Sequence, residues 1–446
     1  MANDMMPWRQ YEILPDVTLT VLPTDRFKVG MLSLSFVLPF SRQDATARSL
    51  LFSVLRRGCR RYPSMADINR RLDELYATPY RVIDRTRDGY QYVGFGAELL
   101  ETRYLLDKTD LCREVLTLMS EMLFHPLTDE NGLLHERYVE QEKKNAIDYL
   151  RSRKNHPSSY AMARFLDAFR DDDPFSLPLI QGAEDRVRAI TPERLTQLWQ
   201  ELLRCAPIHL FYVGGLPAEQ LVESLRSVLG SAFAGVGRMS RPVTACPRLA
   251  LPSRRELRRL QEQGEEGQSH LILGFRSGVT LSSPDYYAMM LCHELLGQSP
   301  ISRLFVHVRE AHSLCYSCFS MYGHERGEVI VSCGISAENR DRAEQAILEQ
   351  IEVLKRGDFS QAEWVAAKKS LIGSCRQLED STNGLANFYE KRIRLWPNHT
   401  IEEYVTRYQA LTREDVMAVA KKLCPDMIYF RQGMGRDEQE EEGTDE

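Results

Sequence analysis

The residues best suited to chemistry lie close together in the second half of the chain. Arg309 ends a helix predicted over 302–310, and Tyr316 lies in a strand predicted over 314–321. A guanidinium and a phenol that converge on one point could hold a peptide carbonyl or an oxyanion. Each also has an ordinary structural role, because arginine at a helix C-terminus complements the helix dipole and a strand tyrosine often packs in a core. The residues alone leave both interpretations open.

The same strand carries a C-x-x-C pair, Cys315 and Cys318, among the ten cysteines of the chain. Zinc sites and redox sites both use such pairs. In a regular strand, however, residues three apart point to opposite faces of the sheet. The sequence therefore favours buried, reduced thiols over a zinc or redox role for this pair.

Histidine spacing argues against a metal site. His307 and His312 lie about 140° apart around a helix, whereas a helical zinc pair needs imidazoles about one turn apart. His293 stands beside Glu294 without a further ligand at a suitable spacing and is interpreted as a helix-face residue. The chain also lacks a P-loop, a G-x-G-x-x-G, a G-x-S-x-G and an H-E-x-x-H. We therefore expect this chain to bind no cofactor and no metal.

Composition and charge narrow the class of protein. The 446 residues are 43% hydrophobic and 27% charged, which predicts a globular chain of two or three domains. The formal net charge of −6 comes from the acidic end of the chain, and the balanced remainder argues against a nucleic-acid-binding face. No run reaches the ~20 apolar residues of a membrane span, and the N-terminus does not resemble a secretory signal. A cytoplasmic location is expected.

Hydrophobic periodicity predicts the elements that position these residues. In the first half it predicts strands over 17–21, 31–38, 81–84 and 90–97, and helices over 44–57, 64–76, 110–123 and 137–153. In the second half it predicts strands over 269–275, 314–321 and 328–335, and helices over 285–296, 302–310, 343–355 and 361–376.

An internal repeat joins the two halves at an offset of roughly 220 residues, which is too long for a solenoid period. Its quoted pairs are Thr191 with Thr412, Gly214 with Gly433, and Lys143-Lys144 with Lys368-Lys369. The predicted fold is α+β, with two homologous domains that each pack a mainly antiparallel sheet with helices. The domains are expected at 1–234 and 255–434, with a linker at 235–254 and a disordered acidic tail at 435–446.

The chain over about 8–434 resembles the pitrilysin/insulinase family of metallopeptidases, in the short form of a mitochondrial processing peptidase subunit. The segments that carry the resemblance are 56–63, 302–310 with 314–316, and the duplicated strand ends. The resemblance implies a clamshell in which two such chains enclose a chamber. It also implies a zinc motif, H-x-x-E-H, on the first helix.

That motif falls on 49–53. This chain has Ser49 and Ser53 where the motif has its two histidines, and Phe52 where it has its glutamate. These three positions are expected off the apolar face of the helix, toward a cleft. The third family ligand corresponds to Glu142, which is expected to be an exposed or salt-bridged residue. The resemblance therefore implies a homologue that is inactive alone. A serine hydrolase is disfavoured, because neither serine has a nearby histidine or a nucleophile elbow.

The family's substrate-holding arginine and tyrosine correspond to Arg309 and Tyr316. Because some members divide the work between two chains, the resemblance implies a heterodimer in which a sister chain carries the zinc and this chain grips the peptide substrate. It also resembles a bacterial subfamily linked to aminopentanol modification of elongation factor P. The alternative function is a peptide-binding or assembly scaffold without proteolysis.

Overall fold

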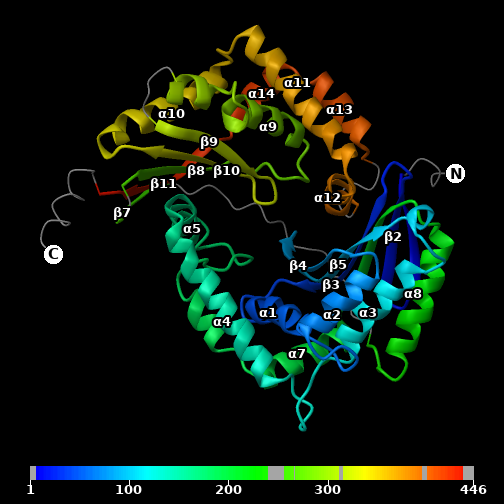
Figure 1. Cartoon of the computed structure of the whole chain (residues 1–446). Helices are drawn as coiled ribbons and strands as arrows, with labels where there is room; N and C mark the ends of the chain where they lie inside the picture. The colour runs from blue at the N-terminus through cyan, green and yellow to red at the C-terminus, as the bar shows by residue number, and fades with distance from the viewer. Residues whose placement is uncertain (1–6, 240–255, 266, 311–314, 394–398, 435–446) are drawn as a thin grey trace, which may run out of the picture. The chain divides into compact units, whose positions relative to one another are not determined.

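The computed structural model describes residues 7–239, 256–265, 267–310, 315–393 and 399–434, which form two compact units (Figure 1). Unit 1 comprises Met1–Leu150, Gly182–Pro247 and Gln377–Asn398, and unit 2 comprises Arg151–Gln181, Arg248–Arg376 and His399–Glu446. Each unit thus takes one segment from the opposite half of the sequence. The predicted acidic tail, and the predicted linker beyond residue 239, lie outside the described residues.

Unit 1 is built on a six-stranded sheet in the order β1-β2-β6-β3-β5-β4. Strands β2 and β6 run parallel, and every other neighbouring pair is antiparallel. The strand bounds are Arg9–Leu14 (β1), Val17–Pro23 (β2), Val29–Pro39 (β3), Tyr80–Arg87 (β4), Tyr90–Leu100 (β5) and Ile208–Gly214 (β6). The central strands β3 and β5 are buried along nearly their whole length, which explains their long apolar runs.

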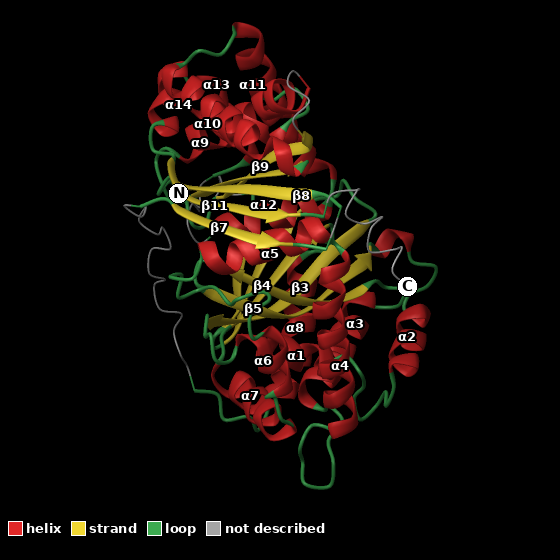
Figure 2. Ribbon diagram, turned by 90° about the vertical axis from the view of Figure 1, so that its left-hand side faces the viewer, coloured by secondary structure: helices red, strands yellow, loops and turns green. Residues whose placement is uncertain are grey.

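Helices cover both faces of this sheet. Figure 2 shows α1, α3 and α8 on one side of β3 and β5, over the main core of the unit. The helix bounds are Ala45–Leu55 (α1), Met65–Glu74 (α2), Leu111–Phe124 (α3), Glu136–Ser152 (α4), Ala183–Arg188 (α6), Pro192–Cys205 (α7), Ala218–Phe233 (α8) and Thr382–Arg392 (α12), with a 3-10 turn at Thr102–Tyr104. Helix α12 covers the other face, where Val37 of β3 lines a pocket with Glu390.

Unit 2 is built on a five-stranded sheet in the order β7-β11-β8-β10-β9. Its strand bounds are Arg258–Gln263 (β7), Ser269–Arg276 (β8), Cys315–Gly323 (β9), Glu328–Ile335 (β10) and Cys424–Gln432 (β11). Strands β7 and β11 run parallel and the remaining pairs are antiparallel. Without β1, the order in unit 1 matches this one strand for strand, so the predicted α+β fold with two duplicated domains is confirmed.

The helices of unit 2 also lie on both sides of its sheet, with α5 on one side and α9 and α10 on the other (Figure 1). The helix bounds are Pro157–Phe169 (α5), Tyr286–His293 (α9), Arg340–Arg356 (α10), Gln361–Gln377 (α11), Ile401–Ala410 (α13) and Arg413–Ala420 (α14). Short 3-10 turns span Arg153–Asn155, Ala337–Asn339 and Leu378–Asp380.

Two segments that the periodicity predicts as regular helices are wound as π-helix instead. These are η3 at Glu294–Gln298 and η4 at Leu304–Glu310. Gly297 lies so close to β9 that an added Cβ would meet the backbone nitrogen of Ser320 at 2.8 Å. This close approach of helix to strand requires glycine, and π-helical turns are frequent at functional sites.

Helices α5 and α12 are the pieces that the two halves exchange, and neither was predicted. Pro157 and Thr382 begin them, separated by the same number of residues as Lys143 and Lys368 of the sequence repeat. Phe165 and Phe169 of α5 pack against Tyr429 in the core on one face of the unit 2 sheet. The exchange is therefore reciprocal and belongs to the duplicated fold.

The predicted start of the helix at 64 agrees with the structure, where Ser64 opens α2 with a capping box to Asp67. The paired threonines of the sequence repeat, Thr191 and Thr412, cap the equivalent helices α7 and α14. Strand β7 was missed because it is an edge strand with one apolar residue, Leu260, among polar ones. Within the described ranges, no helix is long and apolar enough to cross a membrane.

Candidate functional site

Helix α1 carries the positions where the resemblance places a zinc motif. Ser49 donates its hydroxyl hydrogen bond to the carbonyl of Ala45 at 2.9 Å and accepts one from Gln91 Nε2 at 3.2 Å. Ser49 and Ser53 are both half-buried. The Ser49 hydroxyl is thus engaged within unit 1, and a neutral hydroxyl is a poor zinc ligand in any case.

Phe52 does not face a cleft, so the expectation that 49, 52 and 53 lie off the apolar face is wrong for its central member. The Phe52 side chain is 1% exposed, and its ring meets the Phe95 ring edge-on with centroids 5.3 Å apart. Helix α1 is buried on several sides, because it packs against both β5 and α7. Where the family motif has its glutamate, this chain has part of the core.

Glu142 forms an ion pair with Arg57, which follows the end of α1. The Glu142 side chain is buried, and Asn145 Nδ2 donates to its Oε1 at 3.3 Å. The prediction of a salt bridge for Glu142 is confirmed, and the alternative, an exposed side chain, is wrong. A guanidinium therefore supplies the positive charge that a metal would supply beside this carboxylate. Two hydroxyls, a phenyl ring and an engaged carboxylate do not fit zinc.

Arg309 and Tyr316 are side chains of unit 2 that lie outside its core. The Arg309 side chain is exposed, and its guanidinium lies over the Phe305 ring at 4.6 Å from the centroid. Tyr316 is 71% exposed on β9, which is the edge strand of its sheet. Residues 311–314 between them, including His312, lie outside the described residues.

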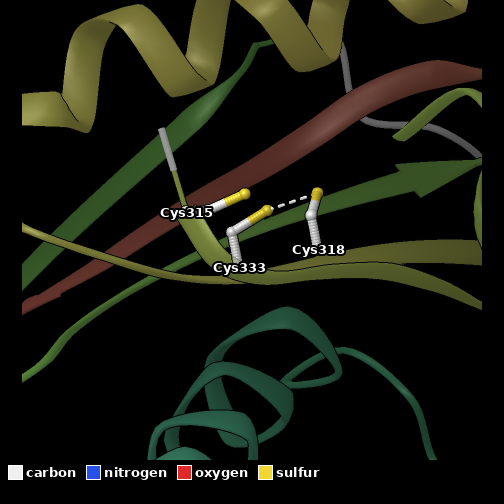
Figure 3. Close-up of side chains that lie close together, drawn as sticks. All are labelled: Cys315, Cys318 and Cys333. Atoms are coloured by element: carbon white, nitrogen blue, oxygen red, sulfur yellow. Dashed lines mark hydrogen bonds between the residues drawn. The ribbon is translucent and has the colours of Figure 1, made fainter. Parts of the chain in front are cut away.

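Strand β9 contains a bulge that overturns the argument against the C-x-x-C pair. Cys318 pairs with Cys333 and Ser317 with Gly334, but the next pair is Cys315 with Ile335, so Tyr316 is left over. The extra residue rotates the strand by one position, and Cys315 and Cys318 point to the same face. Figure 3 shows the three sulfur atoms of Cys315, Cys318 and Cys333 converging from the two neighbouring strands.

The three thiols influence one another strongly. Hydrogen bonds from Cys318 and Cys333 lower the pKa of the Cys315 thiol to about 4. The pKa of Cys318 is raised by its hydrogen bond to Cys315, and burial raises the pKa of Cys333. Cys318 and Cys333 have Sγ atoms 2.7 Å apart. The group therefore readily holds one thiolate and two thiols.

His293 and Glu294 at the end of α9 are buried, although the sequence predicted a helix-face residue. Burial lowers the pKa of His293 to about 4 and raises the pKa of Glu294. Among the described residues, His293 Nε2 and Glu294 Oε1 have no hydrogen-bond partner. Buried polar atoms without partners are rare, and here they lie where the backbone turns from α-helix to π-helix.

Sequence reasoning missed Arg57 and Cys333. Arg57 carries no local signal, because its partner Glu142 is distant in sequence. Cys333 could have been found, since 314–321 and 328–335 were both predicted as strands and form a hairpin. Counting outward from the turn between them pairs Cys318 with Cys333.

Comparison with known proteins places the chain among peptidase homologues. A family profile described as "Peptidase M16 inactive domain" matches residues 189–371. The chain is 27% identical to the "Probable inactive metalloprotease YmfF" of Bacillus subtilis, over 94% of this chain and 96% of that one. It is 24% identical to the "Uncharacterized zinc protease YmxG" of the same organism, over 69% of this chain and 72% of that one.

Solved structures show the same architecture. A conserved protein from Enterococcus faecalis superposes with a TM-score of 0.87 at 23% identity, covering 96% of this chain and 99% of that chain. At this identity the likeness shows the fold, with both duplicated units present in one chain.

Proposed function

Because this chain belongs to the M16 (pitrilysin/insulinase) peptidase family, as a homologue of the inactive kind, we propose that it is the peptide-holding subunit of a heterodimer whose sister chain carries the zinc. The observation that supports this most is a contrast between two sets of positions. At the zinc-motif positions, Phe52 is buried in the core and Glu142 is ion-paired with Arg57. At the substrate-holding positions, Arg309 and Tyr316 are exposed.

The surroundings of Arg309 suit a group that holds a peptide. The Arg309 guanidinium lies over the Phe305 ring, which restrains its position, and the N–H groups of a guanidinium can donate to a carbonyl oxygen. Tyr316 offers a phenol hydroxyl on the same edge strand that exposes Phe319 and Met321. An edge strand with exposed apolar side chains can receive an extended peptide. In this proposal Arg309 and Tyr316 hold the peptide backbone and the sister chain's zinc cleaves it.

Co-purification tests the partnership. The full chain, tagged and expressed in its own organism, should bring down a homologue that contains H-x-x-E-H, and the complex should contain zinc that is lost when the histidines of that homologue are replaced. A chain that purifies alone, or only with copies of itself, would contradict the heterodimer. The link to elongation factor P modification stays a prediction.

Point variants test whether Arg309 and Tyr316 bind the peptide backbone. In the reconstituted complex, Arg309→Ala should lower the rate of peptide cleavage roughly ten- to a hundredfold, because a hydrogen bond from a charged donor contributes ~1.5–3 kcal/mol. Tyr316→Phe should lower it less, because it removes one neutral donor and keeps the ring. Glu310→Gln is the matched control, since Glu310 is exposed beside Arg309 and is expected to leave the rate unchanged.

The same variants separate this function from that of a scaffold. A scaffold without proteolysis would give a complex that shows no cleavage with any variant. A cleaving complex in which Arg309→Ala lowers only the melting temperature would assign the arginine a structural role. Either result would reject the shared-site proposal.

A further inference from the structure

Cys315, Cys318 and Cys333 form the one group of three potential metal ligands in the described part of the chain. Their sulfur atoms all lie within 4.8 Å of one another (Figure 3). No other trio of histidine, cysteine, aspartate or glutamate residues in the described ranges meets this distance. The cluster lies in unit 2, whereas Ser49, Phe52, Ser53 and Glu142 lie in unit 1. The cluster is therefore built from other residues than the zinc position that the family implies.

A distortion of strand β9 brings the three cysteines together, which suggests that they bind a ligand. A bulge is needed to bring Cys315 to the face of Cys318, and it costs one unpaired residue in the ladder. Bulges are typical of places where a sheet re-aims a side chain for function. Packing alone would not require this, because a strand without the bulge would turn position 316 toward this face and could bury a small apolar residue there.

The burial of the three sulfur atoms favours the binding of a cation. Cys318 is 4% exposed, Cys333 is 1% exposed and Cys315 is 9% exposed. Several thiolates in such a place would repel one another and lack water, so a bound cation must compensate them. Soft sulfur ligands favour thiophilic cations such as Zn²⁺ and Cu⁺ over hard cations such as Mg²⁺ and Ca²⁺.

We propose that Cys315, Cys318 and Cys333 bind one thiophilic d¹⁰ metal ion, Zn²⁺ or Cu⁺, through three thiolates. Because one of the three sulfur atoms is already a thiolate, binding forms three metal–sulfur bonds, breaks two S–H bonds and releases two protons. The complex with Zn²⁺ then carries one negative charge and the complex with Cu⁺ carries two. A Zn²⁺ ion would complete its usual four ligands with water, which can approach from the side of the least buried thiol, Cys315.

The geometry requires one adjustment. Thiolates on one Zn²⁺ at ~2.3 Å lie about 3.8 Å apart, so the Cys318 and Cys333 sulfur atoms must separate from 2.7 Å. Rotation of the two side chains about Cα–Cβ can provide this. Metal binding would join the edge strand β9 to β10 and hold the bulge that presents Tyr316. Since the ion binds the native state, it should raise the stability of unit 2.

The first experiment uses the full chain, purified under reducing conditions, stripped with a chelator and titrated with Co²⁺ as a spectroscopic probe. A thiolate-to-cobalt charge-transfer band should grow to saturation at about one equivalent, and Zn²⁺ or Cu⁺ should displace it. Competition between the two ions identifies the tighter one. No band, or a band without a stoichiometric end point, would overturn the site.

Variants assign the band to residues. Cys318→Ser and Cys333→Ser should each abolish it, and Cys315→Ser should abolish or strongly weaken it. Cys292→Ser is the matched control, because Cys292 is a buried cysteine of the same unit outside the cluster. Melting curves of the metal-free variants check folding, and the milder Cys315→Ser keeps the test open if the buried variants do not fold.

Two further results would reject the proposal. A band that survives in all three cluster variants but disappears in Glu142→Gln would put the metal at the family position instead. Thiol counting and mass spectrometry that find a Cys318–Cys333 disulfide in freshly purified, non-reduced protein, with no metal uptake after reduction, would make the cluster a redox pair.

Discussion

The two units share one fold but differ in how they fill the space between the sheet and the equivalent helices α1 and α9. In unit 1 the positions of the family's zinc motif are filled, because Phe52 packs into the core and Glu142 forms an ion pair with Arg57. In unit 2, α9 passes into π-helix and leaves polar atoms of His293 and Glu294 buried without partners. The two units thus share the strand order, but one packs this place with apolar and ion-paired side chains and the other holds buried polar groups there.

The largest expected effect tests whether the Phe52 side chain is part of the core of unit 1. Phe52→Ala should destabilise the protein by about 3–5 kcal/mol, because it removes a fully buried ring that touches two other rings. Chemical denaturation followed by circular dichroism measures this. Leu106→Ala is the control, since Leu106 is 94% exposed and its truncation should change little. A small effect of Phe52→Ala would mean that the position is an open site after all.

The next prediction tests the buried histidine of unit 2. The pKa of His293 is about 4 in the folded chain, against its ordinary 6.5. Between these values the unfolded chain binds a proton that the folded chain does not, so stability falls as pH decreases from about 6.5 to 4. The loss due to His293 should reach about 3 kcal/mol at pH 4.

Because carboxylates also titrate in this range, the measurement is a difference between proteins. His293→Gln should lose about 3 kcal/mol less than the wild type between pH 7 and pH 4. The control is His125→Gln, which changes an exposed histidine of unit 1 and should follow the wild-type curve. Equal curves for all three proteins would show that His293 is not held neutral.

A double-mutant cycle on Arg57 and Glu142 tests the ion pair that stands at the third ligand position. Removing either partner leaves a charge with little water around it, so Arg57→Met and Glu142→Gln should each destabilise the protein. The coupling energy should be about 1–3 kcal/mol. An additive cycle would indicate that Glu142 is not committed to Arg57. In that case restored histidines at 49 and 53 could recruit it to a metal.

The smallest effect compares equivalent helix starts in the two units. Thr191→Ala and Thr412→Ala each remove a side chain that accepts a hydrogen bond from the backbone of the first helical turn. Each should cost about 1 kcal/mol. Thr412→Ala should cost somewhat more, because Thr412 and Asp415 form a complete capping box. A reversed order would show that the packing around the two helices outweighs their caps.

The sequence patterns predicted the duplicated fold well, and the physical reason is that both halves repeat strong apolar periodicity. Strand β10 was predicted at its observed bounds, because all its residues are buried. The exchanged helices α5 and α12 were missed, since their packing depends on distant strands. The candidate site was harder. Periodicity placed Arg309 and Tyr316 on the right elements, but it assumed a regular strand and therefore missed the bulge that gathers the cysteines.

The reciprocal exchange of α5 and α12 has a consequence for synthesis on the ribosome. Unit 1 cannot be completed when its own half of the chain has emerged, because Glu390 of α12 pairs with Arg85 and Arg87 of β4. Until Arg392 leaves the exit tunnel, one face of the first sheet lacks its covering helix. The nascent chain must therefore keep a partly uncovered sheet in solution from the completion of β6 until α12 emerges near the end of translation. A gene split between the halves would yield two fragments that each need the other to finish folding.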